Sequence, residues 1–210
     1  MYIDMGMQLL KTQHWETQYS LSLELYEMSA SVSCMHGNHV RMSSCLDEIL
    51  SHARTFDDSL MASSLLVKLL ASSSKFEEAR SNCLKILSNL GEVFPQDINL
   101  PLILNELSSM QATLRNITRK QINLLPPMTD RKKLNAMKFL NMLCMHSNIS
   151  KPMLVPLLSC RMVRLTMEYG FCDDSIVGLA TAGHSGVSFY MSLVYHSSLG
   201  VRSTSHDRQT

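Results

Sequence analysis

The chain has 210 residues, enough for one large domain or two small ones around a buried core. It is 45% hydrophobic and 18% charged, which is typical of a globular chain and excludes an intrinsically disordered one. Its net charge of +1 creates no general attraction for nucleic acid or acidic lipid, so we expect no nucleic-acid partner.

The composition also favours helices over strands. The chain contains 16 Met, and Leu is frequent, whereas aromatic residues make up only 6%. Leu and Met are good helix formers, and aromatic and β-branched residues are the ones that strands prefer. We therefore predict an all-α fold.

Residues 17–35 and 39–53 predict the first pair of helices, separated by Gly37. In the first helix Leu23, Tyr26 and Ala30 share one face. The apolar stripe of the second helix consists of Met42, Cys45, Leu46, Ile49 and Ala53. Two helices joined across one glycine indicate a helical hairpin.

A second hairpin is predicted from residue 56 to Pro95. Asp57 and Asp58 suit the N-cap and first turn of its first helix, on which Leu66 and Leu70 share a face. Ser74 and Glu77 have the spacing of a capping box for the second helix. Its predicted buried stripe is Phe76, Ala79, Cys83, Ile86, Leu87 and Leu90. Gly91 then suits a left-handed helix end.

The two hairpins align with an offset of 37 residues. This alignment pairs Gly37 with Ser74, Met42 with Ala79, Leu46 with Cys83, and Ile49 with Ile86. The offset is close to the roughly 34 residues of a tetratricopeptide repeat, although the Trp-Leu-Gly-Tyr signature of that repeat is absent. We predict stacked antiparallel hairpins forming a tetratricopeptide-like array; the alternative is an irregular helical bundle.

Beyond Pro95 the pattern becomes less regular. A helix over 98–117 has Asn99 as its cap and Pro101 in its first turn, and Thr129 or Asp130 caps a later helix. The stripe of that later helix includes Leu134, Met137, Leu140 and Leu143. Another helix is expected to start at Ser150, with Pro152 early, a kink at Pro156 and an end at Gly170; the last opens at Asp173, Asp174 and Ser175. The predicted divisions are hairpins over 1–117, a linker over 118–130, further helical repeats over 131–191 and a disordered tail over 192–210.

Two features bear on the compartment. Six cysteines are scattered without a C-x-x-C pair, at Cys34, Cys45, Cys83, Cys144, Cys160 and Cys172. The opening MYIDMGMQLLK lacks the basic region and the long apolar core of a secretory signal. We therefore expect reduced, mostly buried cysteines in a cytoplasmic protein. The stretch 176–194 is long enough to span a membrane, but its serines, glycines and His184 favour a buried terminal helix.

No motif predicts catalysis, and we expect no catalytic, cofactor-binding or metal-binding residue. Cys34, His36 and His39 are suitable zinc ligands, but no second cluster supplies a fourth ligand. The GHSGV at 183–187 has Val187 where a hydrolase nucleophile elbow needs glycine. The basic residues of the linker region favour a solvated surface over a phosphate-binding patch: Arg119, Lys120, Arg131, Lys132 and Lys133.

Four stretches together resemble one family. They are LELYEMSASVS after Trp15, KFEEARSNCLKILSNLGEVFP, LLPPMTDRKKLNAMKFLNML, and CRMVRLTMEYGFCDDSIVGLATAG. They are similar to the helical-repeat region of large multidomain signalling ATPases of the STAND type, the signal-transduction ATPases with numerous domains. The resemblance covers about residues 1–190 and depends on small motifs such as LPPMTD and EYGFCDDS.

In the resembled family the repeats do not carry catalysis. The ATPase domain precedes them, often after a protein kinase domain, and sensory or histidine kinase domains follow. The present sequence has no G-x-x-x-x-G-K-[ST] loop to bind nucleotide phosphates. The resemblance therefore implies a fragment that lacks the ATPase domain. We expect a non-catalytic interaction or regulatory module that binds a protein or peptide, or adjacent ATPase or kinase domains; the alternative is a segment of an ATP-dependent signalling enzyme.

Overall fold

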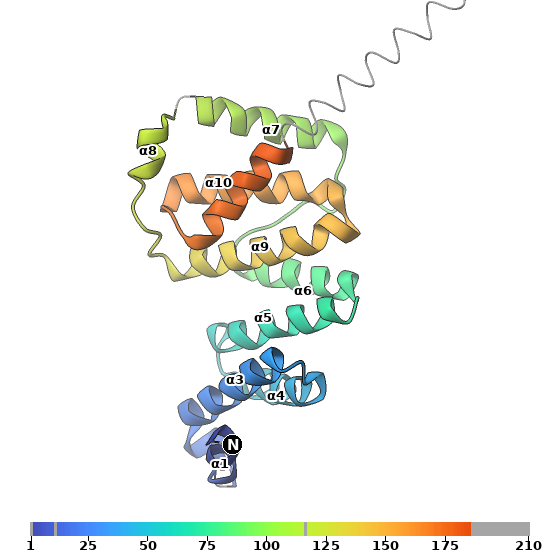
Figure 1. Ribbon diagram of the computed structural model, residues 1–210, viewed down its shortest axis with the longest axis vertical. Helices are drawn as coiled ribbons and strands as arrows, with labels where there is room; N and C mark the ends of the chain where they lie inside the picture. The colour runs from blue at the N-terminus through green and yellow to red at the C-terminus, as the bar shows by residue number, and fades with distance from the viewer. Residues whose placement is uncertain (1, 11, 116, 186–210) are drawn as a thin grey trace, which may run out of the picture. The chain divides into compact units, whose positions relative to one another are not determined.

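The computed structural model describes residues 2–10, 12–115 and 117–185, and within this part the fold is all-α. The chain forms two compact units, Met1–Asn89 and Leu90–Thr210. The first unit contains α1 Tyr2–Gln8, α2 His14–Thr17, α3 Tyr19–Met35, α4 His39–His52, α5 Phe56–Ser72 and α6 Phe76–Asn89 (Figure 1). The second contains α7 Leu100–Arg115, α8 Arg119–Asn123, α9 Arg131–Ser150, a 3₁₀ turn Pro152–Leu154, α10 Val155–Tyr169 and a helix over 173–185.

The first unit consists of two stacked helical hairpins, α3 with α4 and α5 with α6, as the sequence predicts. The bounds of α5 and α6 lie 37 residues after those of α3 and α4, so the predicted repeat is confirmed at the level of whole helices. Helix α5 packs against both helices of the first hairpin, which is the arrangement of a tetratricopeptide-like array. The buried core between the hairpins includes Ala30, Met42, Leu46, Ile49, Ala62 and Leu65.

Both hairpins turn through the same backbone motif. Gly37 and Ser74, which the sequence alignment pairs, are left-handed, with φ of 67° and 59°. The Asn38 N–H donates to the Ser33 carbonyl, and the Lys75 N–H donates to the Leu70 carbonyl, each closing a Schellman motif. The prediction that Ser74 caps α6 is therefore wrong, because Ser74 is the left-handed residue of the turn and Lys75 precedes the first helical residue.

The start of α5 also differs in detail from the prediction. Its N-cap is Thr55, whose hydroxyl accepts from the Asp58 N–H while the Asp58 carboxylate accepts from the Thr55 N–H. Asp57 and Asp58 lie in the first turn, as expected, but neither is the cap. Because the capping box uses a side-chain acceptor at the third helical position, Asp58 contributes from inside the helix.

In the second unit, α10 packs against both α7 and α9. Its apolar residues meet those of α7 in one buried cluster that includes Ile103, Leu107, Met110, Leu157, Cys160 and Val163. The predicted caps at Asn99 and Asp130 are confirmed by hydrogen bonds to backbone N–H groups of α7 and α9. Gly170 ends α10 and Gly91 follows α6, and both are left-handed.

Three expectations for the second unit are wrong. Residues 118–130 are not a plain linker, because a Thr118–Gln121 capping box forms the short helix α8 within them. Ser150 does not start a helix: α9 continues through it, and the break comes at the 3₁₀ turn that Pro152 opens. Pro156 produces no kink, because it lies in the first turn of α10, where its missing N–H is not needed.

The division between the units at Asn89 and Leu90 comes earlier in the chain than the predicted linker, so the helix α7 belongs with α9 and α10. The predicted tail over 192–210 and the part of the 176–194 stretch after residue 185 lie outside the described residues. No helix in the described part is both long and apolar enough to cross a bilayer.

Candidate functional site

An open groove runs along one side of the first unit, between α4 and the second half of α5. Its volume is about 730 Å³. Helix α4 contributes Val40, Ser43, Ser44 and Asp47, and α5 with its C-cap contributes Leu66, Leu69, Leu70 and Ser73. Each set has the i, i+3, i+4, i+7 spacing of a single helix face, so two parallel rows of side chains form the walls. His39, Glu48 and Lys75 complete the lining.

The wall residues are partly available to a ligand. Val40 is 84% exposed, and Leu66, Leu69 and Leu70 are half-buried. The prediction that Leu66 and Leu70 share a face is confirmed, and that face lines the groove. Since Ser43 and Ser44 are small, the backbone of α4 can be approached closely there.

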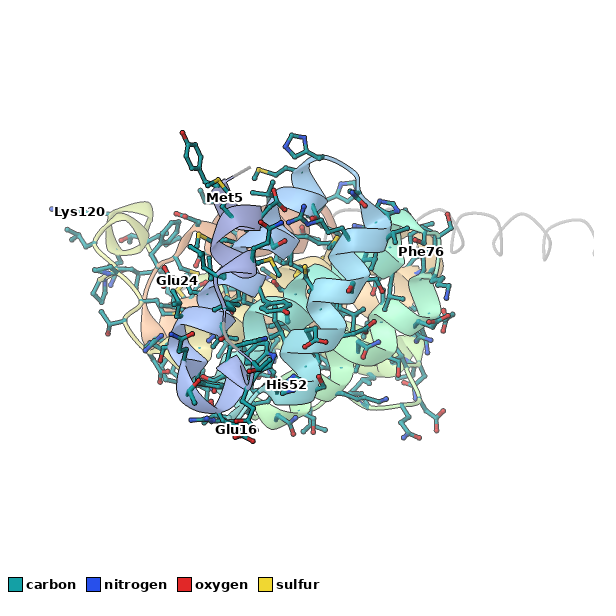
Figure 2. All side chains as sticks on the ribbon, turned by 90° about the horizontal axis from the view of Figure 1, so that it is seen from below. Met5, Glu16, Glu24, His52, Phe76 and Lys120 are labelled. Carbon is teal, nitrogen blue, oxygen red and sulfur yellow. The ribbon has the colours of Figure 1, made fainter. Side chains whose placement is uncertain are left out.

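An aromatic cluster fixes one end of the groove. The Trp15 Nε1–H donates to Glu48 Oε2 over 3.2 Å. The His52 ring stacks on Trp15 with the ring centroids 4.7 Å apart and the planes 3° apart, and its Nδ1 lies 3.6 Å from Glu48. Figure 2 labels His52 at the end of α4. The hydrogen bond from Trp15, the only tryptophan of the chain, thus orients the carboxylate of Glu48.

A second set of contacts connects the first hairpin to α5. The Tyr19 hydroxyl donates to Asp58 over 2.7 Å and accepts from the Arg54 N–H. The Arg54 guanidinium lies 4.1 Å above the centre of the Tyr19 ring. The hydrogen bond from Tyr19 lowers the pKa of Asp58, while burial, followed by that hydrogen bond, raises the pKa of Tyr19. These contacts hold the two hairpins, and hence the two groove walls, in one register.

The second unit contains a buried carboxylate that sequence reasoning missed. Glu92 is 3% exposed, and it accepts hydrogen bonds from Lys133 over 2.8 Å and from Arg161 Nε over 2.5 Å. Burial alone would raise the pKa of Glu92, but the bonds from Arg161 and Lys133 outweigh it and hold this pKa below its ordinary value. Lys133 also lies 5.2 Å from the centre of the Tyr169 ring.

This cluster is structural, because the buried carboxylate is held by hydrogen bonds from both Lys133 and Arg161. It joins the segment after α6 to α9 and α10, which supply Lys133 and Arg161. Lys133 is consequently not part of a solvated basic run, as the sequence suggested, whereas Lys120, Arg131 and Lys132 are exposed. No sequence signal distinguishes Glu92 from a surface glutamate after a helix end.

The motifs LPPMTD and EYGFCDDS, which carry the family resemblance, lie against each other in the second unit. The Phe171 N–H donates to the Pro126 carbonyl over 2.7 Å, and the Met128 N–H donates to the Phe171 carbonyl over 2.8 Å. A small apolar pocket of about 450 Å³ lies beside this pairing, lined by Ile122, Leu125, Pro127 and Phe171. The motifs thus serve to join the end of α10 to the segment before α9.

The candidate zinc ligands are not assembled into a site. Cys34 is half-buried near the end of α3, whereas His36 and His39 are exposed. Among the described residues, no group of three or more His, Cys, Asp or Glu side chains is placed to hold a metal ion. All six cysteines are free, and burial raises the pKa of Cys83 to about 12 and that of Cys160 to about 11. These thiols behave as small apolar side chains.

The GHSGV motif falls only partly within the described residues. Gly183, His184 and Ser185 continue the helix that starts at residue 173, and no strand precedes them. Gly186 and Val187 lie outside the described part. The helical setting is unlike the strand-to-helix turn that a nucleophile elbow requires.

Comparison with protein-family models, with curated proteins and with solved structures gives no match to this chain. The role of the groove is therefore inferred from its own geometry and chemistry.

Proposed function

We propose that the chain is a non-catalytic interaction module that binds a protein or peptide segment in the groove between α4 and α5. The observation that supports this is a pair of facing rows that line about 730 Å³ of open space. One row is Val40–Asp47 on α4, and the other is Leu66–Ser73 on α5 and its C-cap. This volume lies within the roughly 300–1,000 Å³ that ligand sites occupy. Two rows at helical spacing suit an amphipathic helix laid into a groove.

The lining also defines the chemistry of the ligand. Leu66, Leu69 and Leu70 favour aliphatic side chains, and Asp47 is an exposed carboxylate at the rim. A matching segment would therefore carry leucine-like residues on one face and a basic residue on its flank. The one lysine among the described lining residues, Lys75, is paired with Glu78, with 3.5 Å between Nζ and Oε1. The charge that the groove offers to a ligand is therefore the carboxylate of Asp47 on α4.

Peptide binding tests the proposal directly. A library of labelled amphipathic helical peptides with basic flanks is measured against the full chain by fluorescence polarisation. Trp15 emission provides a second signal, since Trp15 is hydrogen-bonded to the groove residue Glu48. We expect Val40→Glu and Leu70→Glu to weaken binding by about tenfold or more, the usual effect of a charge placed in an apolar contact.

Val93→Glu is the matched control. Val93 is 78% exposed, close to the 84% of Val40, but it lies in the second unit and outside the groove. It should leave affinity unchanged. Asp47→Lys should shift the preference toward peptides with acidic flanks. Equal loss of affinity in the Val40 and Val93 variants, or no binding by any peptide class, would contradict the groove as the binding site.

The resemblance to STAND-type ATPases supports a wider proposal. We infer that the module belongs to a large cytoplasmic signalling protein, where it would also contact adjacent ATPase or kinase domains. The alternative is that it is one segment of an ATP-dependent signalling enzyme. An immunoblot of source-cell lysate decides the first point: a band several times heavier than 23.7 kDa supports the large protein, and a band at that mass contradicts it. An upstream phosphate-binding loop in the heavier protein would favour the alternative.

A further inference from the structure

Helix α3 has an apolar face on the side away from α5. Leu25, Met28 and Val32 lie along it, and Met28 is 41% exposed. Leu21 and Met35 extend the same row in both directions and are 49% and 77% exposed. The five residues follow the spacing of a helix–helix contact stripe. We call Leu25, Met28 and Val32 the outer face of α3.

The internal repeat identifies what this face is equivalent to. The 37-residue offset pairs Leu25 with Ala62, Met28 with Leu65 and Val32 with Leu69 on α5. Ala62 and Leu65 are buried in the core between the two hairpins, and Leu69 packs against that core. The face that α3 leaves partly open is therefore the face through which α5 contacts the preceding hairpin.

Helix α1 covers this face incompletely. It contacts α3, and Gly6 allows a close approach, because a Cβ there would lie 3.1 Å from a Leu25 methyl group. None of the described residues of α1 is buried, and Tyr2 and Leu9 are more than 80% exposed, at 83% and 81%. Met5 on α1 and Glu24 on α3 are labelled in Figure 2. Seven residues of helix do not replace the two helices that cover the same face of α5.

We propose that the outer face of α3 is a docking surface for a further helical hairpin of the same 37-residue kind, supplied by a partner segment. This rests on the proposed function in that both describe an interaction module, but it names a different surface and a different partner. The partner would present the pattern that α3 and α4 present to α5, in which Met42, Leu46 and Ile49 form one aliphatic stripe.

A second copy of this chain does not offer that pattern. The first hairpin receives α5 on a surface formed by Ala30, Met42, Leu46 and Ile49. The equivalent residues of α5 and α6, 37 positions later, are Val67, Ala79, Cys83 and Ile86. All four are buried, so they are not available to receive α3 from another molecule. The occupant is thus a separate amphipathic hairpin with its own aliphatic stripe.

The experiment supplies such a hairpin within one chain. A second copy of residues 19–55 is inserted between Thr55 and Phe56. The new junction joins Thr55 to Tyr19, and because Tyr19 is the equivalent of Phe56 in the repeat, it has the same register as the natural junction of Thr55 with Phe56. Helix α3 of the inserted copy, the one next to Phe56, then packs on α3 and α4 of the original copy, as α5 does in the unaltered chain. We expect both copies to resist limited proteolysis and the thermal midpoint to rise by about 4 °C or more.

One substitution placed in either copy provides the control. Met28→Glu in the copy next to Phe56 should abolish the gain, because this Met28 takes the place of Leu65 in the new interface. The same change in the copy next to Gln18 should shift the midpoint by less than about 2 °C, since that side chain stays on the open face. Leu25→Ala in the copy next to Phe56 should increase the gain, because Ala62 is the equivalent residue.

Two results would overturn the proposal. One is an inserted copy that is cleaved as an unfolded loop, with no rise in midpoint even after Leu25→Ala. The other is an unaltered chain that is a dimer and that Met28→Glu converts to a monomer, since the occupant would then be a second copy. Neither result affects peptide binding in the groove of the unaltered chain, so failure here is distinguishable from failure of the proposed function.

Discussion

Two left-handed residues close the hairpins of the first unit, and only one of them is a glycine. Ser74 has φ of 59° and Gly37 has φ of 67°. A side chain in this conformation costs about 1 kcal/mol, which glycine avoids. We therefore expect Ser74→Gly to raise the free energy of unfolding by about 0.5–1 kcal/mol, measured by urea titration.

The neighbouring serine is the control for this change. Ser73 has φ of −90°, a conformation that every residue adopts easily. Ser73→Gly should lower the free energy of unfolding by a few tenths of a kcal/mol, about the entropic cost of a glycine. If both variants shift stability in the same direction, the left-handed strain at Ser74 is not the cause.

The pairing of Gly37 with Ser74 could be predicted from the repeat, but the role of Ser74 could not. A serine three residues before a glutamate also matches a capping box, and the sequence cannot show that the helix starts one residue later. The backbone bonds of the Schellman turn, from Asn38 to Ser33 and from Lys75 to Leu70, decide the matter in the structure.

Among the elements, the junction between the end of α10 and the segment before α9 depends on one glycine. Gly170 has φ of 104°, and a Cβ there would lie 2.4 Å from the Pro126 carbonyl oxygen. Alanine would therefore be strained and would push the two segments apart. We expect Gly170→Ala to lower the free energy of unfolding by about 2–4 kcal/mol, measured by chemical denaturation.

Gly183 gives the matched control for this substitution. It is helical, and a Cβ there would meet nothing within 4 Å. Gly183→Ala should be neutral or stabilising by up to about 1 kcal/mol, because alanine is the better helix former. A small effect at Gly170 would mean that the Pro126–Phe171 pairing is easily displaced.

The existence and type of the long helices could be predicted from periodicity, whereas the connections between them could not. Helix α8 was missed because its five residues are too few to show a period, and it depends on the Thr118–Gln121 capping box. Pro156 suggested a kink because the 3₁₀ turn that restarts the chain at Pro152 leaves no pattern in the sequence.

For the molecule as a whole, the candidate groove could not be predicted residue by residue. Its rows come from α4 and α5, and their facing depends on contacts such as Tyr19 with Asp58 that join residues 39 positions apart. Helical periodicity locates a face, but it does not show which neighbour covers that face.

The buried ion cluster makes the stability of the second unit depend on Glu92. Glu92 and Lys133 are largely buried, at 2% and 15% side-chain exposure, and Arg161 is partly exposed. Removing the charge of Glu92 leaves both cations without their carboxylate, so Glu92→Gln should lower the free energy of unfolding by about 3 kcal/mol at neutral pH. Glu106→Gln is the control. Glu106 pairs with Arg164, but both side chains are about a third exposed, at 28% and 38%, so the change should cost less than about 1 kcal/mol.

The same cluster predicts that the free energy of unfolding falls at acid pH. Because the pKa of Glu92 is lower in the folded than in the unfolded chain, the unfolded chain binds the proton more readily. The stabilisation is therefore complete above the ordinary value of 4.5 and is lost as the pH falls through the lower, folded pKa. Urea titrations from pH 7 to pH 3 should show the difference between wild type and Glu92→Gln shrinking below about pH 5. A difference that stays constant over this range would mean that Arg161 and Lys133 do not hold the carboxylate ionised.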